Sequence, residues 1–150
     1  MNDDLHELYQ DIILSHNKRP RNYGVLHPHS HEAEGYNPLC GDKIEVYLQI
    51  EGDRIAGIRF EAAGCAISKA SASIMTEQLK GKTLAEADAL FDKVHEILDP
   101  ASDAQPDLET AGDLAALAGV RKFPARIKCA SLPWYTFRAA LRGEGRAVTE

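Results

Sequence analysis

Apolar and polar residues alternate most clearly near the middle of the chain. Apolar side chains at positions 44, 46, 48 and 50 are separated by Glu45, Tyr47 and Gln49, which predicts a strand with one buried face. The segment Glu51-Gly52-Asp53 is typical of a turn, and residues 55–62 continue as a second strand. The two strands therefore form a hairpin, and residues 32–36 favour a third strand beside it.

Most of the remaining chain has helical spacing. Apolar residues recur every three or four positions between Leu5 and Ile13, which predicts an amphipathic first helix. Thr83 and Glu86 have the spacing of a capping box in front of a helix over residues 84–98. Further helices are expected over residues 66–79, closed by Gly81, and over residues 107–118. The last helix should run from near Leu132 to Gly143, with Pro133 in its first turn and Pro124 as a break before it.

This order of elements predicts the fold class. Strands come first and helices follow, so we expect an α+β domain in which helices pack on one face of a small antiparallel three-stranded sheet. A length of 150 residues suits a single domain over residues 1–150, with enough buried surface for a core that needs no disulfides.

Composition and charge narrow the classes of function. The net charge of −6 makes a nucleic-acid partner a poor expectation. No apolar run approaches the roughly 20 residues that a membrane span needs, so no membrane partner is expected. The acidic start of the chain lacks the pattern of a signal peptide, from which we expect a reducing cytoplasm. An odd number of cysteines there favours metal binding or catalysis over a disulfide framework.

The three cysteines lie in different local contexts. Cys40 has Asp42 two residues further on, Cys65 stands where a strand passes into a helix, and Cys129 opens a second helical stretch. A hairpin brings its outer ends together, so Cys40 and Cys65 should be neighbours, and Cys129 could reach the same end of the sheet. Three thiolates and one carboxylate would complete a four-ligand zinc site, with Arg126, Lys128 and Lys69 as candidates to offset its charge.

Other interpretations of these residues stay open. Free cysteines are often simply buried packing residues, and the spacing is not the paired CxxC of a zinc ribbon. His27, His29 and His31 alternate, so on an extended segment they would face one side and could bind metal, although a solvated loop is favoured.

Several segments resemble the U-type iron–sulfur assembly proteins, the family of IscU, the N-terminal domain of NifU, and SufU. They are residues 8–13, residues 16–22, Asn37-Pro38-Leu39-Cys40-Gly41-Asp42, residues 64–71 and Arg126-Ile127-Lys128-Cys129. IscU-like scaffolds carry a histidine before the third cysteine, where this chain has Lys128. The segment of about residues 95–117 is also longer here than in the scaffolds. Both departures resemble the SufU-type branch and imply a fold of the SufE/NifU-like kind.

The resemblance implies an activity and a set of site residues. It implies a zinc-dependent sulfurtransferase of iron–sulfur cluster biogenesis, which accepts persulfide sulfur from a SufS-like, pyridoxal phosphate-dependent cysteine desulfurase and passes it to downstream assembly proteins. Carried over by position, the zinc ligands are Cys40, Asp42, Cys65 and Cys129, and the sulfur acceptor is Cys40. A partner residue would replace Cys40 on the metal, and Arg126 is a candidate to steer the released thiolate.

Two other functions use the same residues. One is a scaffold that assembles an iron–sulfur cluster, with iron in place of zinc, on the three cysteines. Lys128 speaks against it, because a protonated ammonium group cannot bind a metal. The other is a purely structural zinc module with no transfer activity.

Overall fold

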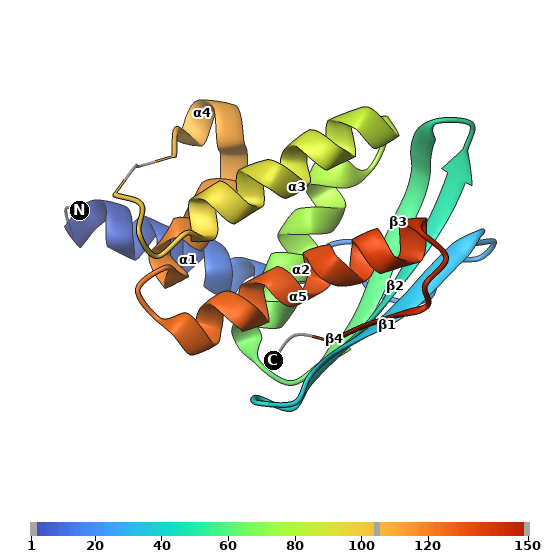
Figure 1. Ribbon diagram of the computed structural model, residues 1–150. Helices are drawn as coiled ribbons and strands as arrows, with labels where there is room; N and C mark the ends of the chain where they lie inside the picture. The colour runs from blue at the N-terminus through green and yellow to red at the C-terminus, as the bar shows by residue number, and fades with distance from the viewer. Residues whose placement is uncertain (1–2, 104–105, 149–150) are drawn as a thin grey trace.

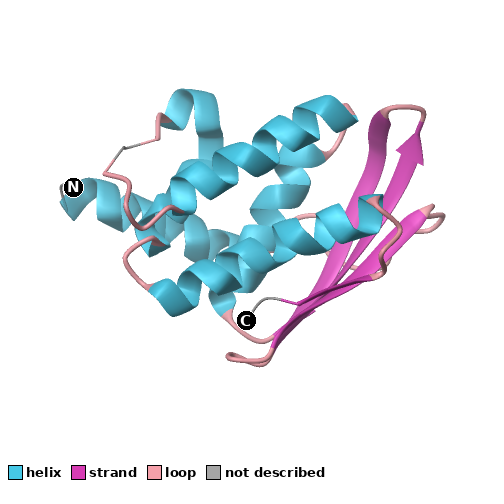
Figure 2. Cartoon of the chain, in the orientation of Figure 1, coloured by secondary structure: helices cyan, strands magenta, loops and turns pink. Residues whose placement is uncertain are grey.

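The computed structural model describes residues 3–103 and 106–148, which form a layer of helices against one sheet (Figures 1 and 2). In chain order the elements are α1 (Asp3–Lys18), β1 (His31–Asn37), β2 (Asp42–Glu51), β3 (Arg54–Ala63), α2 (Ala66–Leu79), α3 (Leu84–Leu98), α4 (Leu108–Ala111), the 3₁₀ helix η1 (Gly112–Val120), α5 (Pro124–Leu141) and β4 (Arg146–Val148). The expected α+β class is confirmed, and the helices lie on one face of the sheet.

The sheet differs from the expected three-stranded antiparallel one. It has four strands in the order β3-β2-β1-β4, and β4 runs parallel to β1. The hairpin of β2 and β3 and the antiparallel pairing of β1 with β2 were predicted correctly. β4 is only three residues long and reaches β1 only after α5 has crossed the sheet, so no local alternation of residues marks it.

The start of the last helix was also predicted wrongly. Pro124 was interpreted as a break, yet it occupies the first turn of α5, where its missing N–H costs no hydrogen bond. Pro133 lies inside the helix, not in its first turn. As a result Cys129 stands within a continuous helix and not before one. The expected helix over residues 107–118 is divided at Gly112, whose φ of +59° ends α4.

Helix α5 is the element that joins the helical layer to the sheet. It packs across β1 and β2, and the Trp134 side chain at its centre is fully buried, with its ring N–H donating to Ser71 Oγ at 3.2 Å. Helix α2 begins one residue after Cys65 and packs against α5. This packing brings three segments that are distant in the sequence to the same end of the sheet.

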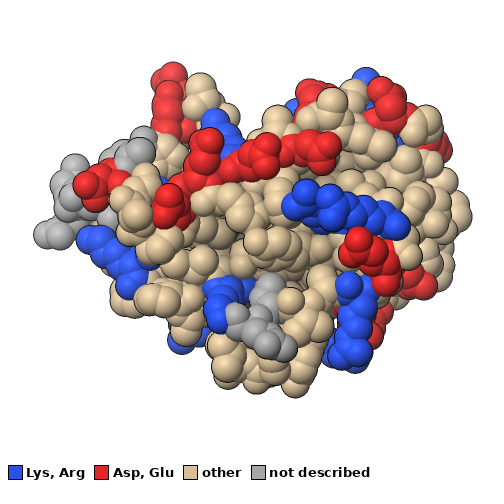
Figure 3. Space-filling model, in the orientation of Figure 1, with Lys and Arg blue, Asp and Glu red and all other residues tan. Residues whose placement is uncertain are grey.

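The described surface carries both signs of charge. In the view of Figure 3, acidic side chains form a row over α3, and basic side chains are scattered over the rest of the same face. None of the helices in residues 3–103 and 106–148 has the length and hydropathy of a membrane span.

Gly35 provides a test of the contact between β1 and α5. A Cβ at this position would overlap Thr136 Oγ1 and lie 2.8 Å from Ile44 Cγ2. We expect Gly35→Ala to lower the free energy of unfolding by about 1–3 kcal/mol, the usual cost of overpacking a core, measured by chemical denaturation. Gly57→Ala is the matched control, because its Cβ would meet the flexible end of the Leu26 side chain at 3.3 Å and Gln49 Cβ at an ordinary contact distance of 3.7 Å. Equal losses in the two variants would contradict the prediction.

Candidate metal centre

The candidate centre forms where the turn between β1 and β2 meets the start of α2 and the first turns of α5. Asn37 and Asp42 are paired across the β1–β2 hairpin, so Cys40 lies on the turn between them. Cys65 is the N-cap of α2, and Cys129 lies in the N-terminal half of α5. The three cysteine segments therefore lie at the same end of the sheet.

Two of the cysteines are in direct contact. Cys129 Sγ lies 3.5 Å from Cys40 Sγ, and both lie with an Asp42 carboxylate oxygen in a group whose ligand atoms are all within 4.8 Å of one another. Sulfurs that share a tetrahedral zinc with Zn–S bonds of about 2.3 Å stand about 3.8 Å apart. The observed separation is therefore close to the one that a shared zinc ion requires.

The carboxylate of Asp42 supplies the strongest evidence that these residues fit a cation. Asp42 is fully buried, and its Oδ1 accepts a hydrogen bond from the Cys65 backbone N–H at 2.7 Å. Its Oδ2 is also buried but has no hydrogen-bond partner among the described residues. A buried carboxylate oxygen without a partner is costly, and a metal ion at this position would remove that cost.

Cys65 lies beside this group but faces a different direction. Its Sγ accepts from the Ile67 backbone N–H and from Arg126 Nη1, both at 3.3 Å. It is outside the group of atoms within 4.8 Å of one another, although the Cys65 backbone N–H donates to Asp42 Oδ1 in that group. The sulfur would have to turn away from Arg126 to become a fourth ligand.

The electrostatics of the centre follow from burial and from the crowding of sulfurs. The pKa of the Cys129 thiol is raised, first by burial and then by its contacts with Asp42 and Cys40. The negative charge of Cys65 raises the pKa of the Arg126 guanidinium. Without a metal, the Cys129 thiol favours the protonated form. A bound metal would reverse this, because a thiol that coordinates a metal is deprotonated outright.

The other residues singled out in the sequence lie elsewhere. Lys69 Nζ stands over the Tyr23 ring, 5.3 Å from its centroid, and Lys128 lines a hollow between α5 and β4. Of the three histidines, His29 donates from Nδ1 to Leu26 O at 2.7 Å, and its Nε2 lies 3.7 Å from Glu32 Oε2. None of His27, His29 and His31 belongs to a group of potential metal ligands found in the described residues.

Two residues support the centre that the sequence reasoning did not assign. Asn37 Nδ2 donates to Cys129 Sγ at 3.8 Å. From the sequence, Asn37 was expected only to be part of the segment that contains Cys40. Gly64 has a φ of +121°, and a Cβ there would lie 2.5 Å from Asp42 Oδ1 and 2.9 Å from Asp42 Cα. The sequence held a signal for Gly64, because it directly precedes the candidate ligand Cys65. A glycine at such a position allows the backbone to approach a neighbouring group closely.

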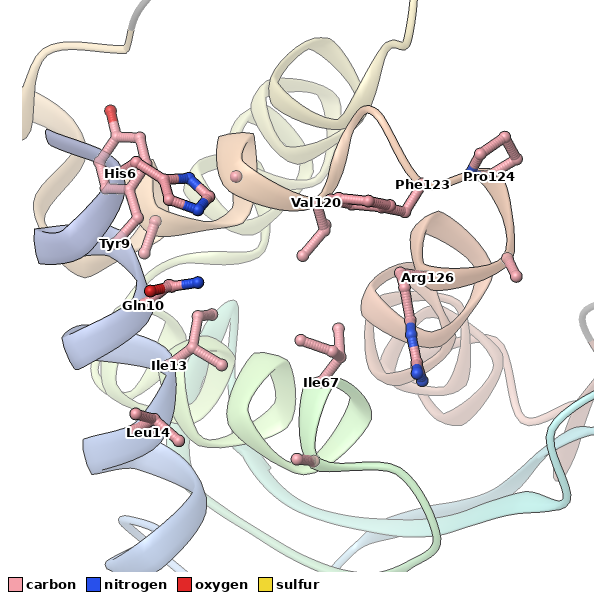
Figure 4. A pocket seen from close by; sticks show the side chains of 14 residues that line it. His6, Tyr9, Gln10, Ile13, Leu14, Ile67, Val120, Phe123, Pro124 and Arg126 are labelled. Carbon is pink, nitrogen blue, oxygen red and sulfur yellow. The ribbon is translucent and has the colours of Figure 1, made fainter. Parts of the chain in front are cut away.

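A hollow of about 880 Å³ opens next to the centre, between α1, η1 and the starts of α2 and α5. Figure 4 shows Tyr9, Ile13 and Leu14 on one side, Ile67 below and Arg126 on the opposite side. Its lining is mostly apolar, and Phe123 at its rim is 55% exposed. Because Arg126 also contacts Cys65, the hollow and the centre share a border.

Gly64→Ala should disturb the centre specifically. The new methyl group would press on Asp42 and would also strain the backbone at a positive φ. We expect zinc affinity to fall by about 10-fold or more, measured by competition with a chromophoric chelator. Gly81→Ala is the control, because Gly81 has a φ of +82° with open space around its Cβ position. Equal zinc affinity in the two variants would mean that Gly64 does not support the centre.

Comparison of the sequence with known proteins identifies a family and several relatives. Residues 8–130 match the family described as the NifU-like N terminal domain. The zinc-dependent sulfurtransferase SufU of Bacillus subtilis (strain 168) is 42% identical over 133 residues, which cover 89% of this chain and 88% of the relative. The iron–sulfur cluster assembly scaffold protein IscU of Streptococcus pyogenes serotype M1 is 37% identical over 143 residues, 95% of this chain and 88% of the relative.

A solved structure agrees with the sequence relatives. The SufU of Fervidobacterium islandicum AW-1, assigned as a scaffold of the SUF system, has a TM-score of 0.75 and 32% identity, and the match covers 91% of this chain and 98% of that one. The relatives thus share the fold over nearly their whole length, while their names divide between sulfur transfer and scaffolding.

Proposed function

Because the chain belongs to the NifU-like N-terminal domain family, we propose that it is a zinc-dependent sulfurtransferase of iron–sulfur cluster biogenesis. It accepts persulfide sulfur from a SufS-like, pyridoxal phosphate-dependent cysteine desulfurase and delivers it to downstream assembly proteins. One observation carries the proposal: Cys40 is exposed on the hairpin turn, whereas Cys65 is half-buried and Cys129 is buried. A partner's persulfide can therefore reach Cys40 first.

The transfer is an exchange at sulfur. The Cys40 thiolate attacks the outer sulfur of the desulfurase persulfide, a new S–S bond forms at Cys40 Sγ, and the desulfurase cysteine leaves as a thiolate. No external oxidant or reductant is consumed. The step requires an ionised and accessible Cys40, because the thiolate and not the thiol is the nucleophile.

The residues that would hold zinc are Cys40, Asp42, Cys65 and Cys129. When bound, zinc supplies ionised thiolates at neutral pH. Asp42 contributes a hard oxygen ligand, which is easier to displace from zinc than a fourth thiolate would be. The exposed position of Cys40 lets it leave such a ligand set while the two more buried cysteines stay in place.

Arg126 is proposed to steer the acceptor. Its Nη1 donates to Cys65 Sγ at 3.3 Å, so a guanidinium group lies beside one sulfur of the centre. A cation at this position favours the thiolate form of a cysteine that comes free of the metal. The apolar hollow bordered by Arg126 offers contact area for the desulfurase next to the reacting sulfur.

A scaffold function is the second candidate, and the Streptococcus pyogenes relative favours it by name. The two functions differ in the metal that the protein retains. Metal analysis of the purified protein should give about one zinc ion per chain for the transferase. Addition of iron and sulfide should give a stable visible chromophore only for the scaffold.

A desulfurase assay tests the proposed function directly. Sulfide or alanine production from cysteine is measured with the desulfurase alone and with increasing amounts of this protein. The transferase predicts stimulation that saturates with the added protein and requires its zinc. A zinc-loaded protein that leaves the desulfurase rate unchanged would instead support a structural zinc module.

A further inference from the structure

Two cysteine sulfurs of the centre are in direct contact. Cys40 Sγ and Cys129 Sγ are 3.5 Å apart, while Cys65 Sγ is held by the Ile67 N–H and by Arg126. The pairing also combines opposite exposures, because Cys40 is exposed and Cys129 is fully buried. Any sulfur species formed on Cys40 therefore has a second thiol directly beneath it.

We propose that Cys129 is the resolving thiol for a persulfide on Cys40. It attacks Cys40 Sγ, releases the transferred sulfur as hydrosulfide and leaves a disulfide between Cys40 and Cys129. The inference rests on the proposed function, because it takes Cys40 as the sulfur acceptor. It goes beyond that function in naming how the sulfur is reduced.

The geometry suits displacement at Cys40 Sγ. Exchange at a disulfide sulfur proceeds by attack of one sulfur opposite the bond that breaks. The outer sulfur of a Cys40 persulfide has room on the exposed side of the turn, and Cys129 lies on the buried side. The distance of 3.5 Å matches the separation of about 3–3.5 Å expected for reacting atoms before attack.

The step balances in atoms and electrons. The Cys129 Sγ–Cys40 Sγ bond forms, and the bond from Cys40 Sγ to the outer sulfur breaks with its electron pair on the outer sulfur. The proton of the Cys129 thiol leaves with that sulfur as HS⁻. The two cysteines supply two electrons, which reduce the outer sulfur to the sulfide level found in iron–sulfur clusters. A dithiol reductant then reopens the disulfide for the next cycle.

Neighbouring groups hold Cys129 for this role. Asn37 Nδ2 donates to its sulfur at 3.8 Å, and Ala125 O lies 3.5 Å from it on the preceding turn of α5. These contacts orient the sulfur toward Cys40. Cys65 lacks this orientation, since its sulfur caps the start of α2.

Metal binding and resolution exclude each other at Cys129. A Cys129 sulfur that would be held by zinc is a weaker nucleophile, because the metal withdraws electron density from it and fixes its position. Zinc-loaded protein should therefore keep a Cys40 persulfide for onward transfer, and zinc-free protein should convert it to sulfide. The metal content of the centre thus selects the form in which sulfur leaves.

The experiment loads sulfur without a desulfurase. Protein stripped of zinc by a chelator, and the same protein reloaded with zinc, are treated with inorganic polysulfide, desalted and kept without reductant. Released sulfide is measured by the methylene blue reaction, and the cysteine state is read by mass spectrometry of peptides under non-reducing conditions. Circular dichroism confirms that the stripped protein stays folded.

The zinc-free native protein should release sulfide and contain a peptide linked through Cys40 and Cys129. Cys129→Ser should keep the extra sulfur on Cys40 and release sulfide at least about 10-fold more slowly, as should the zinc-loaded protein, because the neighbouring thiol is lost or occupied. Glu51→Ser, on the exposed far turn of the hairpin, is the control and should behave like the native protein.

Three outcomes would overturn the inference: undiminished sulfide release by Cys129→Ser, a disulfide that joins Cys40 to Cys65, or a zinc-free native protein that keeps its persulfide. The disulfide map of the native protein decides the matter even if the Cys129→Ser variant does not fold. Failure of the proposed function is separate. It would show as no transfer of sulfur from a desulfurase to Cys40, while polysulfide loading still yields sulfide and the Cys40–Cys129 disulfide.

Discussion

Cys40→Ser should reduce stimulation of the desulfurase to the level seen without this protein. The serine hydroxyl is a very weak nucleophile at neutral pH without an adjacent base, so no sulfur can be accepted at position 40. The measurement is sulfide production against protein concentration, together with mass spectrometry for sulfur added to the chain. Because Cys40 is the exposed member of the set, the variant should stay folded, and part of its zinc should remain.

The matched control for this variant is Glu51→Ser, at the far end of the β2 strand. Glu51 is exposed and lies beside the opposite turn of the hairpin, so its replacement should leave stimulation unchanged. Retained stimulation by Cys40→Ser would remove Cys40 from the acceptor role. Loss of stimulation in both variants would mean that the hairpin surface, and not the thiol, matters.

Asp42→Asn should weaken zinc binding by at least about 100-fold, more than the loss of a supporting contact usually costs. The amide keeps the size of the side chain and can still accept the hydrogen bond from the Cys65 N–H. It removes the negative charge and the unpartnered Oδ2, which are the features suited to a cation. Competition with a chromophoric chelator measures the change in affinity.

Asp42→Asn should not lower the melting temperature of the zinc-free protein, although it weakens zinc binding. Without a metal, the native Asp42 side chain is a fully buried carboxylate with an unpartnered oxygen, so the asparagine should leave the melting temperature unchanged or raise it. Asp53→Asn, on the exposed far turn, removes the same charge away from the centre and should alter neither quantity. Equal zinc affinity in native protein and Asp42→Asn would exclude Asp42 as a ligand.

Local patterns in the sequence were sufficient for much of the fold. The helix over residues 84–98 was predicted at its observed bounds, because Thr83 and Glu86 form both hydrogen bonds of a capping box. The hairpin of β2 and β3 followed from alternation around a turn. These elements depend on neighbours in sequence, so their signals lie within short windows.

Other features depend on contacts between distant residues and could not be predicted in this way. Pro124 and Pro133 both suit the first turn of a helix, and only packing of α5 across the sheet decides for Pro124. The candidate site also combines features that local sequence predicts with features that depend on distant contacts. From the hairpin we expected Cys40 and Cys65 to be neighbours, with Cys129 able to reach the same end of the sheet. The structure groups the ligand atoms of Cys40, Asp42 and Cys129, whereas the Cys65 sulfur contacts Arg126 at the start of α5.

The short parallel strand β4 affects the tendency of this protein to associate with itself through strand edges. It pairs with residues 34–36 on the outer edge of β1, which would otherwise present unpaired backbone groups on the strand that leads to the Cys40 turn. Exposed strand edges recruit strands from other molecules, and a very short edge strand gives a second copy little to extend. Strand β4 therefore limits edge-to-edge association of this protein next to the exposed Cys40 turn.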